Sequence, residues 1–106
     1  MTNTENIDEN PRAKVILETS RIPWKELLRF FAGGAVIAVS IELDLVEVAL
    51  QISEDNKIQV EQWMLEGKVA QASDEQAKKW LETDAVLWAV VVKPWILVQH
   101  SNPAIS

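Results

Sequence analysis

The segment Val86-Leu87-Trp88-Ala89-Val90-Val91-Val92 is apolar at every position, and Lys93-Pro94 follows it directly. The run is far shorter than the roughly 20 apolar residues that cross a bilayer. Because side chains alternate between the two faces of a strand, an uninterrupted apolar run is typical of a strand covered on both faces. We therefore expect this segment to be the buried centre of a sheet.

A second strand-like run, Trp95 to Gln99, begins immediately after Pro94. Two connections remain open: a hairpin with a cis proline at the turn, or one long strand that bends at Pro94. Proline has no backbone N–H, and in sheets it is confined to edges and bulges. We therefore expect the run from Trp95 to Gln99 to lie at an edge of the sheet.

The chain before these runs contains residues that typically start and end helices. Proline at a first helical position predicts one helix from Asn10 to Ser20 and a second that starts at Pro23. Gly33-Gly34 ends the second helix, because glycine tolerates the left-handed conformation that follows a helix end. The apolar stretch from Ala35 to Ser40 is then predicted as a strand.

The middle of the chain is also predicted to consist of helices and strands. Asp44 is predicted to cap a third helix, and a slip in apolar periodicity places a break at Ser53 to Asn56. A fourth helix ends at Gly67, and a short strand spans Lys68 to Ala72. Ser73-Asp74-Glu75-Gln76 has the pattern of a capping box and predicts the start of a fifth helix.

The predicted order is ααβααβαββ, which defines an α/β fold. Crossover connections favour parallel neighbours among the first three strands. We expect a small mixed, mainly parallel sheet of three to four strands covered by about five helices. Residues 10–100 form the predicted domain, with a disordered N-terminal tail at 1–9 and a C-terminal tail at 101–106.

The composition of the chain excludes several classes of function. The 106 residues include no cysteine, which removes thiol chemistry, and carry a net charge of −6, which disfavours nucleic acid as a partner. The N-terminus shows neither a basic region nor an apolar signal segment, so a cytoplasmic location without a membrane partner is expected. No motif for a cofactor is present.

Four stretches are familiar when taken together: Gly34 to Ile37, Leu43 to Ala49, Gly67 to Ala70, and Trp88 to Trp95. They resemble the bacterial family catalogued as domain of unknown function 2288. The resemblance covers roughly Ala13 to Gln99, and its most specific part is Val-Val-Val-Lys-Pro-Trp after a Leu-Trp pair. It implies no catalytic residues for this chain.

The predicted parallel strands would end at one edge of the sheet and gather Glu42, Asp44 and Asp74 there, with Lys93 and Trp95 beside them. These three carboxylates, from two separate loops, could hold Mg²⁺ or Ca²⁺, although helix capping and solvated charge explain the same residues. No histidine or cysteine cluster indicates a metal. Trp95, next to Pro94, and Lys93 mark a candidate interaction surface.

The leading hypothesis is a non-enzymatic interaction or ligand-binding domain, since the sequence offers apolar surface but no assembled catalytic set. The alternative is a small metal-assisted hydrolase that uses the acidic edge. A helix-turn-helix regulator is a third possibility, which the acidic charge opposes. Self-association as a homodimer through Trp95 to Val98 is expected, unless the helix from Asn10 to Ser20 covers that strand.

Overall fold

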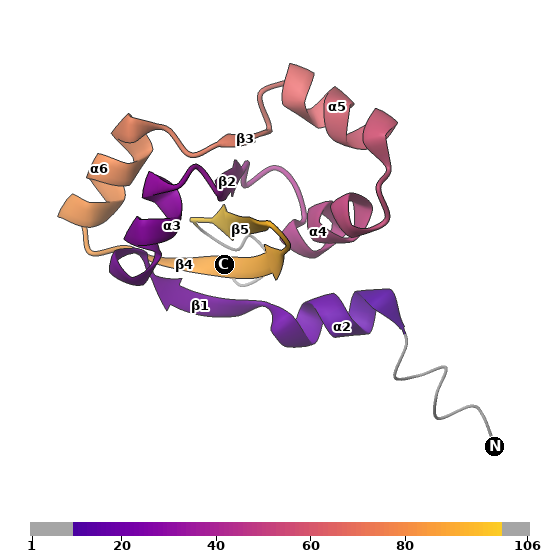
Figure 1. Cartoon of the computed structure of the whole chain (residues 1–106), viewed down its shortest axis with the longest axis horizontal. Coiled ribbons are helices and arrows are strands. Elements are labelled where there is room, and N and C mark those ends of the chain that lie inside the picture. Colours follow the sequence, from indigo (N-terminus) through magenta and orange to yellow (C-terminus); the bar gives the residue numbers. More distant parts are fainter. Residues whose placement is uncertain (1–9, 101–106) are drawn as a thin grey trace.

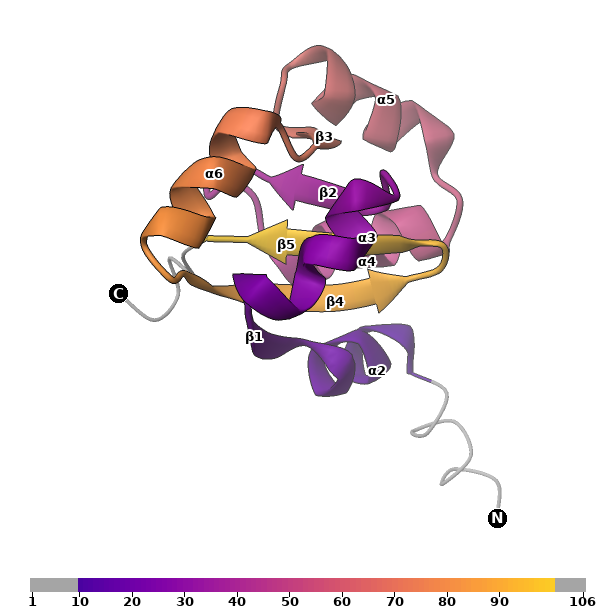
Figure 2. The same ribbon diagram turned by 60° about the vertical axis from the view of Figure 1, so that its left-hand side comes forward.

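The computed structural model describes residues 10–100, which form a five-stranded sheet between two layers of helices (Figure 1). Viewed as in Figure 2, α3 and α6 lie in front of the sheet and α4 lies behind it. The helices are α2 (Pro11–Glu18), α3 (Leu28–Ala32), α4 (Leu45–Ser53), α5 (Lys57–Leu65) and α6 (Asp74–Glu82), with a 3-10 turn η1 (Trp24–Leu27) before α3. The strands are β1 (Ser20–Pro23), β2 (Val36–Val39), β3 (Val69–Gln71), β4 (Val86–Val92) and β5 (Trp95–Gln99). The prediction of an α/β fold with about five helices is confirmed.

The strand order β1-β4-β5-β2-β3 overturns the predicted mainly parallel sheet of three to four strands. Only β2 and β5 are parallel, and the other three neighbouring pairs are antiparallel. The prediction assumed that each crossover helix returns the chain to a parallel neighbour. Instead, β3 pairs antiparallel with β2, and the β4–β5 hairpin places β5 between β4 and β2.

The first strand, β1, was missing from the predicted order. The helix expected to reach Ser20 ends at Glu18, where the Thr19 hydroxyl donates to the carbonyl oxygen of Val15 at 2.7 Å. The chain then extends and pairs with β4, Ile22 opposite Leu87. Two of the four residues of β1, Ser20 and Arg21, are exposed, so the segment lacks the apolar pattern that predicts a strand.

The β4–β5 connection is a hairpin with a cis Lys93-Pro94 peptide bond, the first of the two predicted alternatives. The expectation that the C-terminal strand lies at an edge is wrong, because β5 is the middle strand and has a partner on each side. β4 is therefore an interior strand but not the central one. It is also not covered throughout, since Val86 and Val91 are exposed while Val90 is buried.

Each face of the sheet has its own apolar core. One core packs η1, α3 and α6 against the sheet through a group of buried side chains: Trp24, Leu27, Val36, Ala77, Trp80, Ala85, Leu87, Ala89, Ile96 and Val98. The other packs α2 and α4 against the opposite face: Val15, Val39, Leu45, Val48, Ala49, Val69, Val90 and Leu97. The alternation of Ile96, Leu97 and Val98 between the two cores explains why the interior of β5 is a continuous apolar run.

The helix α5 is bounded by two residues with positive φ. Asp55, with φ 60°, lies in the turn after α4, and Gly67, with φ 74°, follows the end of α5. Asn56 caps the helix by accepting a hydrogen bond from the N–H of Gln59. The predicted break at Ser53 to Asn56 and the stop at Gly67 are both confirmed, and none of the nine residues of α5 is fully buried.

Candidate binding groove

The antiparallel pairing of β2 and β3 separates the three candidate acids. Glu42 and Asp44 follow β2 at the edge of the sheet where β3 begins, since Val39 pairs with Val69. Asp74 follows Gln71 at the opposite edge. The expected convergence depended on parallel strands and does not occur. Between residues 10 and 100, no three His, Asp or Glu side chains are grouped so that they could hold a metal ion.

The two acids after β2 have structural partners. One carboxylate oxygen of Asp44 accepts hydrogen bonds from the N–H groups of Val46 and Glu47, at 2.9 and 3.4 Å, and so caps α4. Glu42 lies 3.4 Å from the ammonium of Lys68. Asp74 occupies the first turn of α6 behind the Ser73–Gln76 capping box, which is confirmed.

Lys93 and Trp95 lie at the end of the sheet where β2 begins, opposite Glu42 and Asp44, in and after the β4–β5 turn. Trp95 is 37% exposed, so part of its side chain is accessible. Its strand position places it on the same face as Leu97, which is the face covered by α4 and α5. At this end of the sheet its side chain lines an open groove.

The groove has a volume of about 470 Å³ and lies between α5, the end of α4 and the sheet. All eight residues that line it are uncharged, and seven are apolar: Ile37, Ile52, Val60, Met64, Val69, Ala70 and Trp95, with Gln71 as the polar member. Met64 is 56% exposed, so the groove opens to the surface and is not a closed cavity. Such a site binds through apolar contact and shape, without an ionic anchor.

The polar member of the lining, Gln71, is already held by the backbone. Its Nε2 donates to the carbonyl oxygen of Gly34 at 2.7 Å, across the start of β2. Gly34 has φ 78°, a conformation that favours glycine. The amide oxygen of Gln71 can accept a hydrogen bond from an occupant, which gives the apolar groove one directional contact.

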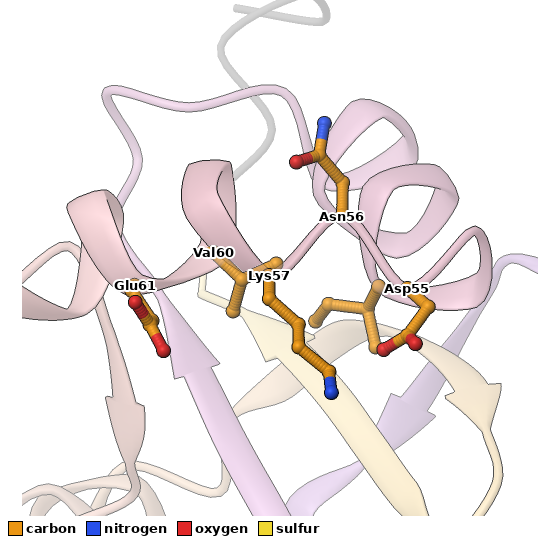
Figure 3. Close-up of a pocket in the computed structure, with 6 residues that line it drawn as sticks. Asp55, Asn56, Lys57, Val60 and Glu61 are labelled. Carbon is orange, nitrogen blue, oxygen red and sulfur yellow. The ribbon is translucent and has the colours of Figure 1, made fainter.

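A smaller hollow of about 150 Å³ adjoins the groove and shares Ile52 and Val60 with it. Figure 3 shows Asp55, Lys57 and Glu61 with their charged ends on one side of the ribbon, around Val60. Asn56 completes the lining. Charged side chains therefore stand at one border of the apolar groove.

A series of side-chain contacts ties α5 to the rest of the fold. Arg12 of α2 forms an ion pair with Glu47 of α4, and Gln51 donates to Glu47 at 2.6 Å. The cap residue Asn56 then donates to the side-chain oxygen of Gln51 at 2.7 Å. The hydrogen bond from Gln51, followed by that from Arg12, lowers the pKa of Glu47 below its usual value. The start of α5 is thus anchored to α4 and α2.

None of the helices between residues 10 and 100 is long and apolar enough to cross a membrane. Fold and groove together define a small α/β domain with a mixed, mostly antiparallel sheet and an apolar recess at one end. The chain belongs to the family described as "Protein of unknown function (DUF2288)", whose model matches residues 10–100. The sequence resemblance to this family is therefore confirmed.

A solved structure has the same fold. The chain is similar to the NMR solution structure of PA1075 from Pseudomonas aeruginosa, with 40% sequence identity and a TM-score of 0.78. The match covers 92% of this chain and 91% of that one. No curated protein matches. Neither the family description nor the structure's title names an activity, so the function of the chain stays unknown.

Sequence reasoning identified Trp95 but not the groove beside it. Val60 and Met64 form the inner face of α5, on the side of the sheet, where they line the groove. Periodicity indicates a direction but not how closely the two surfaces approach. One signal was present in the sequence: Ile58 and Leu65 are out of phase with that inner face, so the helix is apolar on two sides.

Proposed function

We propose that this chain is a binding domain whose groove accepts the apolar side chains of a segment of a partner protein. The observation that carries the proposal is the lining itself: eight uncharged residues, one of them the partly exposed Trp95, surround about 470 Å³. Tryptophan is enriched among residues that dominate binding energy, because its large ring buries much area with little loss of side-chain entropy.

The open shape of the groove favours a protein segment. A closed pocket would bury its lining, whereas Met64 and Trp95 both retain exposed surface. A helix beside a sheet leaves a channel that suits an amphipathic helix, which inserts apolar side chains from one face and keeps its polar face in water. The amide of Gln71 can contact the backbone or a polar side chain of such a segment.

The charge of this chain indicates which side chains the polar face of the partner segment carries. The chain carries −6 overall, and Asp55 and Glu61 stand at the border of the groove with Lys57 between them. A partner segment with lysine or arginine on its polar face would be attracted and oriented by this field, mainly through a faster association rate. We therefore expect a basic, amphipathic segment as the occupant.

Met64 offers a direct test, because the chain contains only two methionines, Met1 and Met64. With ¹³C-methyl methionine, the Met64 signal reports occupation of the groove. The probe is a synthetic amphipathic peptide of about 14 residues with leucine and lysine at helical spacing. The proposal predicts a saturable shift of the Met64 signal and a much smaller shift in the Trp95→Ala variant.

The matched control is a peptide of the same design with glutamate in place of lysine. It presents the same apolar face but the charge that the acidic domain repels. Weaker binding of the glutamate peptide supports the basic partner. An unchanged Met64 signal with the lysine peptide, or equal binding of both peptides, would show that this groove is not a site of the proposed kind.

A further inference from the structure

The helix α5 buries less of itself than the other helices of its length. Three helices have nine residues each: α4, α5 and α6. α4 has four buried residues and α6 has two, whereas α5 has none. Three of the five large apolar side chains of α5, those of Ile58, Met64 and Leu65, are exposed. The apolar contact of α5 with the fold therefore depends mainly on Val60 and Trp63, which are half-buried.

The space beneath α5 is not filled by side chains. The groove of about 470 Å³ lies between α5 and the sheet, and the hollow of about 150 Å³ lies at the start of the helix. Val60 lines both. A side chain next to open space loses the contacts that close packing would give it. Packing therefore stabilises α5 less than it stabilises α4 or α6.

The charges at the two ends of α5 oppose the dipole of the helix. The dipole favours acidic residues in the first turn and basic residues in the last turn. The first turn of α5 has no acidic residue and begins with Lys57, and the last turn has no basic residue and is followed by Glu66. In α6, by contrast, Asp74 and Glu75 occupy the first turn. A helix of nine residues is marginal in water on its own, so α5 depends on contacts that it largely lacks.

Both ends of α5 are tied to folded structure by short connections. Residues 54–56 join it to α4, and residues 66–68 join it to β3. The side chain of Asn56 donates to α4 at 2.7 Å, and the N–H of Ser40 donates to the carbonyl oxygen of Lys68 at 2.8 Å. An intact helix held at both ends in this way cannot swing away from the sheet. It can leave the sheet only by losing its own hydrogen bonds.

We propose that α5 is a conditionally folded wall of the groove: it unfolds locally between Asp55 and Gly67 while the sheet stays intact, and a partner segment in the groove keeps it folded. Segments with few buried contacts open as units, at free energies below that of global unfolding. An occupant that touches Val60 and Met64 adds the packing that the helix lacks. The opening itself is independent of the proposed function, whereas its reversal by an occupant rests on that function.

The sheet beneath α5 is held by its own strand pairing. β3 pairs with β2, and β5 has a partner on each side. The same pairing leaves no free edge on β5 for the second copy of the chain that the sequence predicted there. Loss of α5 would therefore remove one wall of the groove and leave the strands that form its floor in place.

Native-state hydrogen exchange of the full chain, followed by NMR, tests the local opening. Residues 61–65 are the last five of α5, and residues 49–53 are the last five of α4 and serve as the matched comparison. After correction for intrinsic rates, residues 61–65 should exchange at least about a hundredfold faster and with little dependence on urea, because a local opening exposes little surface. Equal protection of the two helices, or the urea dependence of global unfolding in residues 61–65, overturns the proposal.

Two glycines provide matched variants. Gly67 has φ 74°, and a Cβ there would meet no atom within 4 Å, so Gly67→Ala strains only the backbone at the end of α5. Unfolding of α5 releases that strain, and the variant should speed the exchange of residues 61–65 about tenfold. Gly34→Ala imposes a similar strain, at φ 78°, before β2. That strain persists when α5 opens, so the exchange of residues 61–65 should not change. Equal effects of the two substitutions there contradict a local opening of α5.

The lysine peptide tests whether an occupant keeps α5 folded. The methyl signal of Met64 reports binding, and the exchange of residues 61–65 reports the folding of α5. At a peptide concentration about ten times the Kd, exchange of residues 61–65 should slow about tenfold. A shift of the Met64 signal without slower exchange overturns the coupling. An unchanged Met64 signal overturns the proposed function instead, and the exchange of the natural chain then still decides whether α5 opens.

Discussion

The side-chain amide of Gln99 donates to the carbonyl oxygen of Leu43 at 2.8 Å and also to that of Ser40 at 2.9 Å. Gln99 ends the middle strand and is 3% exposed, the one buried polar side chain among residues 10–100. Its two bonds fasten the loop between β2 and α4 to the end of β5. The start of α4 is therefore positioned by the middle strand of the sheet.

Replacing Gln99 with leucine should lower the unfolding free energy by about 2 to 3 kcal/mol, because two carbonyl groups lose their donor in a buried setting. Urea denaturation measures the change. Gln71→Leu is the matched control, since Gln71 also donates to a backbone carbonyl, that of Gly34, but is exposed. We expect less than about 1 kcal/mol there, and equal losses would mean that burial of the amide is unimportant.

Adjacent residues of β4 provide a second comparison. Val90 is 2% exposed and packs in the core under α4, whereas Val91 is 53% exposed on the other face. Val90→Ala should cost about 2 kcal/mol through lost burial and a cavity, and Val91→Ala less than about 0.5 kcal/mol. Urea unfolding of both variants gives the answer, and similar losses would contradict the alternation of burial along β4.

Local signals in the sequence predicted the elements well and their arrangement poorly. The caps at Asp44 and Ser73 and the stop at Gly67 act through neighbouring residues, so they can be recognised in a single sequence. The neighbours of β5 are set by long-range packing. Because the hairpin at Pro94 and the return of β3 along β2 reverse the chain, strands that looked parallel became antiparallel.

The same difference between local signals and long-range packing explains which parts of the groove could be predicted from the sequence. Trp95 was recognisable because an aromatic residue next to a proline departs from a simple core pattern. Its partners Ile37 and Met64 come from a strand and a helix whose separation depends on how α5 rests on the sheet. The acidic edge was predicted from a topology that the structure does not have, and Asp74 lies at the far end from Glu42.

Asp44 allows capping to be distinguished from metal binding. Asparagine caps a helix about as well as aspartate, so Asp44→Asn should change the unfolding free energy by only a few tenths of a kcal/mol, whereas Asp44→Ala should cost about 1 kcal/mol. A metal ligand would behave differently. If Mg²⁺ raised the stability of the natural chain but not that of Asp44→Asn in thermal melts, the capping role would be insufficient.

Acid should weaken the link between α4 and α5 through Glu47. The hydrogen bond from Gln51, then that from Arg12, holds the pKa of Glu47 below its ordinary value of 4.5. The folded state therefore favours the carboxylate. Its contribution is complete above about pH 4.5 and is lost as the pH falls through the lowered pKa. Glu47→Gln should flatten the decline of stability on the acid side in urea unfolding.

Direct titration by NMR tests the cause of that shift. Gln51→Met removes the amide donor and should return the pKa of Glu47 toward 4.5. Gln62→Met is the matched control, because Gln62 donates to Glu66 at 2.8 Å across the same four-residue spacing, in the opposite order along the helix, and is the main cause of the lowered pKa of Glu66. Each variant should affect its own glutamate. A change in the pKa of Glu47 in the Gln62→Met variant would instead indicate a general change in the electrostatic field around α4 and α5.

Trp95 should dominate the quenching of tryptophan fluorescence by acrylamide. The chain has five tryptophans, and Trp24 and Trp80 are buried while Trp95 is 37% exposed at the groove. A neutral quencher needs contact with the indole, so accessibility decides the quenching constant. Trp95→Phe should lower that constant clearly, whereas Trp24→Phe should raise it slightly, because it removes a tryptophan that fluoresces but is shielded from the quencher.

Binding of a partner should shield Trp95. The lysine peptide should therefore protect the natural chain from quenching by acrylamide but have little effect on the quenching of Trp95→Phe. Equal quenching of the natural chain and Trp95→Phe would show that the indole is covered in solution, and the groove would then lack the exposed aromatic contact on which its proposed role rests.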